Sequence, residues 1–390
     1  MKILRVISSM DPKGGGPCQG IRNSISEFKR RGIDNDVLCF DSSDVEYLGT
    51  DDFTIYTIGP STGPYAYCPD LKRWLLDNIL KYDVVIIHGL WLYHSYGTYK
   101  VWNNLKKSGV KVPRLYVMPH GMLDPYFQKA KGRKLKAIRN WLFWKLIENR
   151  VVNNVDGILF TCKEELLLAR EPFFPYKPKR ELNIGYGVLP PPEYNTEMGN
   201  VFFEKCIHWN KKPLWLFLSR IHEKKGVDIL IKAYLKLKLE NNELPQLIVA
   251  GPGLGTNFGK EIQKIAKNNM DILFPGMLAG DSKWGAFYNC EAFILPSHQE
   301  NFGIAIVEAM ACAKPVLITN KVNIWREIKA GEGGFIGFDT EESVYEMLKD
   351  WLSLSSQKKI EIGENAQNTY VQSFSIKEMA DKMINVFKDA

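Results

Sequence analysis

The stretch EAFILPSHQENFGIAIVEAMACAKPVLIT, residues 291–319, decides the fold. A short apolar run at 292–295 leads into a polar loop, an apolar helical pattern starts at about Phe302, and a second short apolar run follows at 316–319. Short continuous apolar runs separated by helices are typical of strands that are buried on both faces of a parallel sheet. The stretch therefore predicts a strand, a helix and a second, parallel strand.

The same alternation recurs on both sides of a proline-rich stretch. Before it, apolar runs such as YDVVIIHG (82–89) and RLYVMPHG (114–121) alternate with helical patterns. The stretch GYGVLPPPEYNTEMGN (185–200) has the composition of a stiff linker, because it holds three consecutive prolines. After it the alternation restarts. We therefore expect an α/β protein of two doubly wound, Rossmann-like domains, 1–190 and 195–370.

Length and composition are those of an ordinary globular protein. The 390 residues suit two domains, 45% of them are hydrophobic, 24% are charged, and the formal net charge is +7. A charge this mild gives little support to a nucleic-acid binder. The seven cysteines include no CxxC pair, which favours reduced thiols, no zinc site and a cytoplasmic location. No apolar run is long enough for a signal peptide or a membrane span.

Two carboxylates, Glu300 and Glu308, bracket the start of the helix predicted in the first stretch. Ligands of open parallel sheets bind at the carboxyl ends of strands, and the loop 296–303 follows such an end. The first amides of a helix attract anions, and Gly303 allows a ligand to approach the backbone closely. The layout suits a nucleotide sugar, with Glu308 on the ribose and Glu300 on the hexose. The alternative is a solvated loop charge and a residue on the outer face of a helix.

Cations for a diphosphate follow another predicted strand. In FLSRIHEKKG (217–226), Arg220 offers a planar fork for phosphate oxygens and Lys225 a point charge, although a charged surface turn would look the same. A third strand end, VAGPGLG (249–255), contains Gly251 and is equally consistent with a tight turn. Because all three loops follow strands of one predicted domain, we expect them to face one crevice.

These residues resemble a known family. The Glu-x7-Glu motif at 300–308, followed by AMACAKPV, is similar to the signature of retaining glycosyltransferases of family 4, which have the GT-B fold. LSRIHEKKGVDILIKAY (218–234) resembles the family's phosphate-binding segment. In the N-terminal half, DPKGGGPCQGI (11–21) and YVMPHGML (116–123) resemble its glycine-rich loop and its histidine segment. The resemblance implies two Rossmann-like domains that face a central cleft, with the helix at 375–390 returning to the N-terminal domain.

The resemblance also implies a role for each motif. The N-terminal domain would face the acceptor and the C-terminal domain the donor, a UDP- or GDP-sugar, with no cofactor and no metal. The activity would be the retaining transfer of a hexosyl unit to a glycan or lipid-linked glycan in cell-surface polysaccharide biosynthesis. The implied catalytic residues are Glu300, His120, Arg220 and Lys225. The implied donor-binding residues are Gly15, Gly16, Arg220, Lys225, Gly251, Met277, Glu300, Phe302, Gly303, Ile304 and Glu308.

Several alternatives stay open at this point. A nucleotide-sugar epimerase or a related enzyme would share the donor site, and His120 could be an ordinary packed histidine. A dinucleotide oxidoreductase is disfavoured because the glycine loop lacks GxGxxG spacing. The segment 129–150 holds eight Lys or Arg against one Glu. It is interpreted either as a core-packed helix with a solvated face, which is slightly favoured, or as a peripheral contact with the inner face of the membrane.

Overall fold

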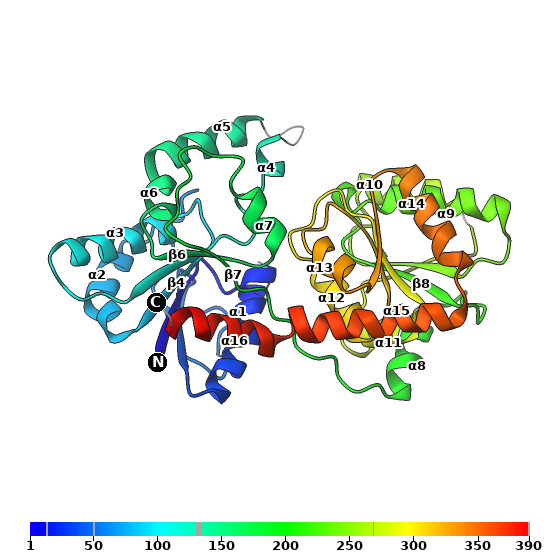
Figure 1. Ribbon diagram of the computed structural model, residues 1–390, viewed down its shortest axis with the longest axis horizontal. Helices are drawn as coiled ribbons and strands as arrows, with labels where there is room; N and C mark the ends of the chain where they lie inside the picture. Colours follow the sequence, from blue (N-terminus) through cyan, green and yellow to red (C-terminus); the bar gives the residue numbers. More distant parts are fainter. Residues whose placement is uncertain (13–14, 50, 130–133, 268, 389–390) are drawn as a thin grey trace. The chain divides into compact units, whose positions relative to one another are not determined.

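The chain divides into two compact units (Figure 1). The first comprises Met1–Gly187 together with Ile376–Ala390, and the second comprises Val188–Ser375. The boundaries expected from the proline-rich stretch, at 190 and 195, lie a few residues after this division. Each unit is a parallel sheet covered by helices, which is the predicted α/β, Rossmann-like architecture. The computed structural model describes residues 1–12, 15–49, 51–129, 134–267 and 269–388.

The sheet of the first unit has seven strands in the order β3-β2-β1-β4-β5-β6-β7, and all neighbours run parallel. The order changes direction between β1 and β4, and β4 is the central strand. The central strands consist mainly of branched apolar residues, as a sheet covered on both faces requires. The strands are β1 Lys2–Val6, β2 Asp34–Cys39, β3 Ile55–Thr57, β4 Val84–His88, β5 Arg114–Met118, β6 Gly157–Phe160 and β7 Glu181–Asn183.

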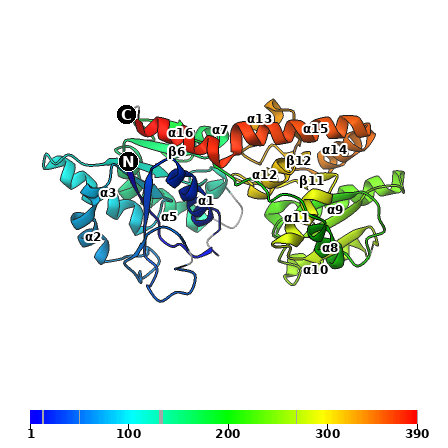
Figure 2. The same ribbon diagram turned by 90° about the horizontal axis from the view of Figure 1, so that it is seen from below.

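Helices cover both faces of this sheet. Helices α1 and α16 lie side by side on one face, where Phe387 of α16 packs on Tyr116 of β5 (Figures 1 and 2). Helices α2 and α3 pack against the other face through a core that contains Leu71 and Trp102. The helices of the unit are α1 Gly16–Arg30, α2 Asp70–Asn78, η2 Ile79–Lys81, α3 Tyr93–Lys107, α4 Tyr126–Lys129, α5 Lys134–Phe143, the π-helical turn η3 Trp144–Glu148, α6 Asn149–Val152, α7 Lys163–Leu168 and α16 Ile376–Lys388.

The sheet of the second unit has six parallel strands in the order β10-β9-β8-β11-β12-β13. The stretch that opened the sequence analysis forms β11, α12 and β12, as predicted, and β11 pairs with β12 in parallel. The helix begins at Ile304 rather than at about Phe302, because Gly303 adopts a left-handed conformation that precedes the first turn. The strands are β8 Leu214–Leu218, β9 Gln246–Ala250, β10 Ile272–Gly276, β11 Ala292–Leu295, β12 Val316–Thr319 and β13 Gly334–Gly337.

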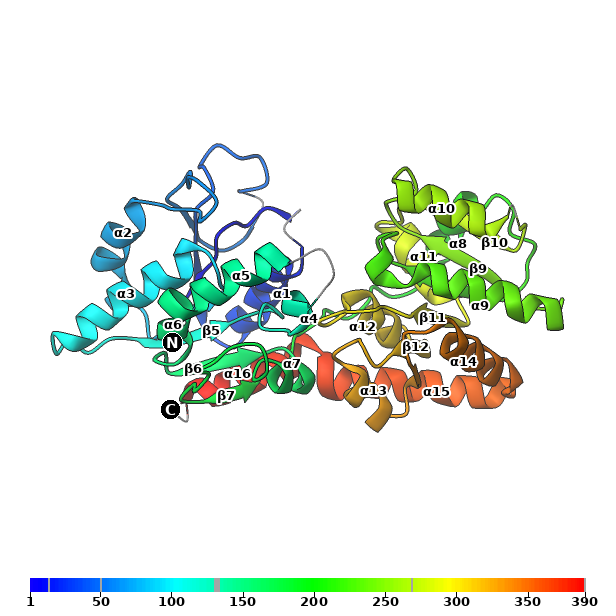
Figure 3. The same cartoon turned by 90° about the horizontal axis from the view of Figure 1, so that it is seen from above.

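Helices again cover both faces of the second sheet (Figure 3). Trp215 of β8 packs edge-on against Tyr234 of α9 on one face, whereas Phe293 of β11 packs on Phe287 of α11 on the other. All seven cysteines of the chain are free thiols, and all are buried. The helical segments of the unit are α8 Thr196–Lys205, η4 Glu223–Lys225, α9 Val227–Glu240, α10 Asn257–Ala266, α11 Asp281–Asn289, α12 Ile304–Ala311, α13 Trp325–Ala330, α14 Glu341–Ser353, α15 Ser356–Thr369 and η5 Tyr370–Phe374.

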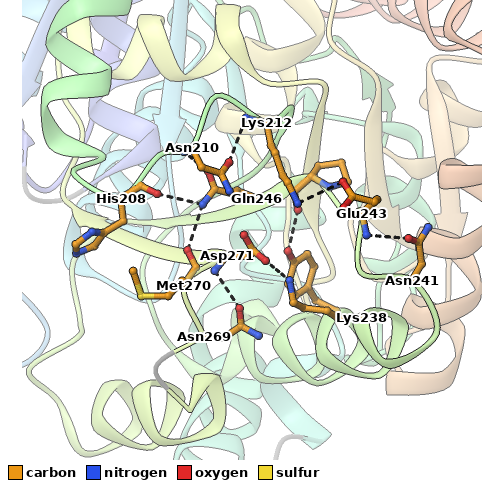
Figure 4. A network of polar contacts seen from close by, with 12 residues as sticks. His208, Asn210, Lys212, Lys238, Asn241, Glu243, Gln246, Asn269, Met270 and Asp271 are labelled. Atoms are coloured by element: carbon orange, nitrogen blue, oxygen red, sulfur yellow. Dashed lines mark hydrogen bonds and ion pairs between the residues drawn. The ribbon is translucent and has the colours of Figure 1, made fainter.

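A polar network closes the amino ends of β8, β9 and β10 (Figure 4). The buried side chain of Gln246, the first residue of β9, accepts a hydrogen bond of 2.9 Å from the Asn210 amide. It also donates to the carbonyls of His208 and Met270, at 3.2 and 3.1 Å. These bonds satisfy every polar atom of the Gln246 side chain. The network therefore has a structural explanation, and it leaves the opposite, carboxyl edge of the sheet as the edge that can hold a ligand.

Candidate active site

The direction of strand order in the second sheet changes between β8 and β11, which pair with each other at its centre. In open α/β sheets, ligands bind outside the carboxyl ends of the strands at this kind of switch point. The loop 219–226 follows β8, and the loop 296–303 follows β11. The two motifs that the sequence singled out therefore flank the position at which the topology predicts a ligand.

These two loops contact each other through both backbone and side chains. The His298 amide donates a hydrogen bond of 2.9 Å to the Lys224 carbonyl. The ammonium of Lys225 forms an ion pair with the Glu300 carboxylate, and both side chains are largely buried. Gly226 packs so closely on the same loop that an added Cβ would lie 2.0 Å from the Pro296 carbonyl oxygen. The predicted phosphate ligand and the predicted hexose ligand are thus direct neighbours.

The loop after β9 meets the loop after β8. The Ile221 amide donates a hydrogen bond of 2.8 Å to the Pro252 carbonyl. Gly251 has a φ of 138°, and an added Cβ would lie 1.9 Å from the Ser219 carbonyl oxygen, so a larger residue would push these loops apart. Arg220 lies between the two contacts, and its side chain is exposed. The three loops therefore meet at one end of the sheet, as their positions after the strands predicted.

Helix α12 starts at this meeting point. Gly303 has a φ of 79° and precedes Ile304, so the first amides of the helix, which have no intrahelical acceptor, lie beside Glu300. The ring of Phe302 is buried and packs edge-on against Phe374, with 5.6 Å between ring centroids. Phe302 and Gly303 can therefore offer a ligand their backbone rather than a side chain. A partial positive charge at the helix start favours a phosphate there.

Glu308 lies in the second turn of α12 and pairs with a lysine that the sequence analysis missed. The Nζ atom of Lys283 in α11 lies 2.8 Å from Glu308 Oε1, and both side chains are mostly buried. The pair explains how a carboxylate can lie among the apolar residues of this helix. Nothing in the sequence distinguishes Lys283 from the other lysines, because its contact depends on how α11 packs.

Met277 follows β10 and lies at the outer edge of this group of loops. Its side chain is exposed, and its carbonyl accepts a hydrogen bond of 3.4 Å from Lys205. The preceding residue, Gly276, accepts a hydrogen bond of 2.8 Å from the Gly251 amide. Met277, one of the implied donor-binding residues, is therefore linked to the loop after β9 through the backbone bond of the residue before it.

The first unit has a switch point of its own, between β1 and β4. Gly15 and Gly16 follow β1, and Gly16 begins α1. The buried hydroxyl of Tyr186 donates a hydrogen bond of 2.7 Å to the Gly16 carbonyl and fixes this loop. Lys13 and Gly14 of the predicted glycine loop lie outside the described residues. Tyr186 belongs to the stretch expected to join the domains, so this contact could not be predicted from the local pattern.

His120 lies after β5 and is paired with a second histidine, His88, at the end of β4. The Nδ1 atom of His88 lies 3.0 Å from the Nε2 atom of His120, and the rings stack with 5.2 Å between centroids. His120 has a φ of 52°, and the turn is held by the buried carboxylate of Glu165, which accepts from the Gly121 amide. His120 is therefore fixed in position from two sides, whatever its role.

Burial keeps the histidines of this unit neutral. Burial lowers the pKa of His120 to about 3, and the nearby guanidinium of Arg5 acts in the same direction. Burial also lowers the pKa of His94 to about 4 and holds that of His88 well below its usual value. A cavity of about 20 Å³ beside the pair is lined in part by Arg5, His88 and Tyr186. Neutral rings can donate through one nitrogen and accept through the other, which allows the contact between His88 and His120.

Mild acid is expected to destabilise the first unit. The unfolded histidines bind protons below a pKa of about 6.5, whereas the folded ones stay neutral down to their lowered pKa values. The stability that these groups contribute is therefore complete above pH 6.5 and declines as the pH falls towards about 4 and about 3. Urea unfolding at about pH 7 and about pH 5 measures the change. The variant His94→Gln should lose less stability over this interval than the wild type, and an equal loss in both would contradict the assignment.

Two family models match the chain. The model described as a glycosyl transferase 4-like domain matches residues 15–184, and the model described as glycosyl transferases group 1 matches residues 202–369. The first match lies within the first unit and the second within the second unit. The two models therefore account for both sheets.

Similar proteins span most or all of the chain. An uncharacterized glycosyltransferase of Methanocaldococcus jannaschii is 23% identical over 424 residues. The alignment covers 100% of this chain and 98% of the relative. The alpha-monoglucosyldiacylglycerol synthase of Streptococcus pneumoniae is 24% identical over 328 residues, covering 81% of this chain and 70% of its own. The crystal structure of Anabaena HepE in complex with UDP and glucose superposes with a TM-score of 0.72 and 17% identity over 100% of both chains. At that identity the likeness shows the fold alone.

Proposed function

We propose, from the premise that the chain belongs to the family 4 glycosyltransferases of GT-B fold, that it is a retaining enzyme for a nucleotide-sugar donor. It moves a hexosyl unit to a glycan or lipid-linked glycan in cell-surface polysaccharide biosynthesis. The observation that carries the proposal is the ion pair of Lys225 and Glu300 beside the start of α12, at the switch point of the second sheet. The ammonium of Lys225 and the first amides of α12 suit a phosphate, and the neighbouring Glu300 carboxylate suits a sugar joined to it.

Each part of the donor, from the diphosphate to the sugars and the nucleobase, is assigned to one of these groups. Arg220, Lys225 and the first amides of α12 bind the diphosphate, and Glu300 accepts hydrogen bonds from hydroxyls of the hexose. Glu308 binds the ribose, while the nucleobase lies near Met277. The crystal structure of Anabaena HepE with UDP and glucose supports a nucleotide-sugar donor. The name of the Streptococcus pneumoniae relative, a glucosyldiacylglycerol synthase, supports an acceptor that carries a lipid.

The reaction needs stabilisation of the departing diphosphate more than it needs a protein nucleophile. The bond between the anomeric carbon and the phosphate oxygen breaks, and the acceptor hydroxyl forms its bond to the same face of that carbon. The hydroxyl proton passes to an oxygen of the departing phosphate. Arg220 and Lys225 stabilise the negative charge that develops on the diphosphate, which is the largest contribution expected from fixed charges in such a site. For the same reason, we expect turnover without a divalent cation.

His120 is proposed to approach the donor sugar from the first unit. Its ring is neutral and is held by His88, so it can present its second ring nitrogen to a hydroxyl of the hexose. Gly15 and Gly16 lie under the phosphates, because neither carries a side chain that would keep the donor away.

A nucleotide-sugar epimerase or a related enzyme remains the second candidate, since it would use the same donor groups. Product analysis separates the two functions. A transferase releases a nucleoside diphosphate and forms a product that contains the acceptor, whereas an epimerase returns an intact nucleotide sugar.

A thermal-shift experiment with UDP, GDP, ADP and their sugars tests the donor site, because binding to the folded state raises the melting temperature. The variant Glu308→Ala is expected to weaken nucleotide affinity about tenfold, as loss of one good hydrogen-bonding carboxylate would. Lys283→Ala is the matched control, because it breaks the same ion pair and keeps the carboxylate. A full nucleotide shift in Glu308→Ala, or an equal loss in both variants, would remove the ribose role from Glu308.

A further inference from the structure

Helix α5 and the turn η3 expose an apolar stripe to solvent. Leu135, Ile138, Leu142 and Leu146 are 84%, 58%, 46% and 63% exposed. Their spacing of three or four residues places them on one side of the helix. Figure 1 shows α5 at the periphery of the first unit. Four exposed branched residues in one row need an explanation, because single exposed apolar residues are common but aligned rows are not.

The opposite side of the helix fixes its orientation. Asn140, Trp144 and Glu148 are buried at a spacing of four residues. The ring of Trp144 stacks on Phe173, with 4.9 Å between centroids. The Glu148 carboxylate accepts hydrogen bonds of 2.9 Å from the Ser95 hydroxyl and the Trp91 amide. Rotating the helix to bury its leucines would break these contacts, so the apolar stripe faces solvent as part of the fold.

The exposed charges that the helix itself places beside the stripe have one sign. Between residues 134 and 150 the sole acidic residue is Glu148, and it is buried. Trp141 is 51% exposed beside the stripe, and the ammonium of Lys145 lies 5.7 Å from the centroid of its ring. Indole rings prefer the boundary between water and lipid, where one edge is apolar and the other is wet. The exposed basic residues that flank the stripe are Lys134, Lys136, Arg139, Lys145 and Arg150.

We propose that this surface, named here the α5 surface and defined by the stripe, Trp141 and the flanking basic residues, docks on an anionic lipid bilayer. The apolar stripe would enter the boundary of the acyl chains, and the basic residues on both sides of it would contact the anionic headgroups. A second copy of the chain fits less well, because a two-fold contact would place these basic residues against each other and bring like charges together. None of the described helices is long and apolar enough to cross a membrane. The contact would therefore be peripheral. Docking of the α5 surface on the bilayer does not depend on which acceptor the transferase uses.

Vesicle co-sedimentation of the full chain tests this docking. The wild type is expected to bind phosphatidylglycerol vesicles at least tenfold more strongly than phosphatidylcholine vesicles, and to lose most of this binding at high salt. The double variant Leu142→Glu/Leu146→Glu should bind at least tenfold more weakly. The matched control is Leu239→Glu in the second unit, at a leucine that is 90% exposed and lies outside the α5 surface. It should bind as the wild type does.

Three outcomes would overturn the proposal. The first is equal binding of the wild type to both kinds of vesicle, or no binding to either at low salt. The second is a loss in Leu239→Glu as large as the loss in the double variant. The third is a lipid-free dimer in analytical ultracentrifugation that the double variant abolishes, which would assign the α5 surface to a second copy of the chain.

Because the double variant lies far along the chain from the donor residues, its nucleotide thermal shift should equal that of the wild type. This readout separates failure of docking from failure of the proposed function.

Discussion

Replacing Lys225 with alanine is expected to lower kcat by a factor of about 10²–10³, the usual effect of removing one group that stabilises a developing negative charge. The ammonium of Lys225 contacts the Glu300 carboxylate and lies beside the start of α12. Without it, Glu300 would repel the charge that grows on the leaving diphosphate. The release of nucleoside diphosphate from the donor sugar, followed under saturating donor, measures kcat.

The neighbouring lysine provides the control for this experiment. Lys224 lies in the same turn, and its contact with the loop after β11 is made by its backbone carbonyl. Lys224→Ala should therefore keep most of the activity. Lys225→Arg keeps the charge and should recover part of the loss. A folded Lys225→Ala protein with wild-type kcat would mean that the diphosphate binds elsewhere.

The variant His120→Ala is expected to lower kcat/KM by about 10²-fold or more, within the range for a side chain that handles a proton or a hydrogen bond in the transition state. The ring is positioned by His88 at 3.0 Å and by the turn that Glu165 holds. Because the ring is neutral, its contribution should not change between about pH 5 and pH 8. Initial rates over this pH interval, with and without the substitution, measure the effect.

Two further variants separate a role of His120 in the reaction from a role in folding. His120→Asn keeps a residue type that accepts a positive φ and should melt close to the wild type while remaining impaired. His208→Ala is the control, because the carbonyl of His208 supports the network at the amino ends of the second sheet. It should retain full activity. Near-normal turnover in a folded His120→Ala protein would exclude His120 from the site.

The fold and the donor loops were predictable from the sequence because they follow from local patterns. Continuous apolar strands predicted parallel sheets, and loops after strands predicted the edge at which Lys225 and Glu300 lie. The contact between these two residues depends on the strand order, because it places β8 beside β11. Their roles in catalysis stay predictions until the variants are measured.

The supporting residues could not be predicted, since their contacts join elements that are distant in sequence. His88 ends β4, and it meets His120 because β4 pairs with β5. Glu165 reaches Gly121 from the helix after β6, and Lys283 reaches Glu308 from a neighbouring helix. A histidine as the last residue of a strand, followed by glycine, was the one available signal in the sequence for the pair of His88 and His120.

The segment 129–150 shows a different limit of sequence patterns. Besides the leucines of the α5 surface it contains the apolar residues Phe143, Trp144 and Ile147, and either set could have packed on the core. The described part of the segment, from Lys134, packs through the set that contains Trp144, because Phe173 stacks on that ring. The helix packs on the core through Trp144, as in the interpretation favoured from the sequence, and its solvent-exposed face carries leucines as well as basic residues.

Helix α16 has a consequence for the order in which the protein is made. It follows the whole second unit in the sequence, yet its buried residues Met379, Met383 and Phe387 belong to the first unit. During synthesis, most of the first unit leaves the ribosome early and stays incomplete until α16 emerges. The part of its sheet that α16 covers is therefore open while the second unit folds, and a chain that stops at the end of η5 would complete the second unit but not the first.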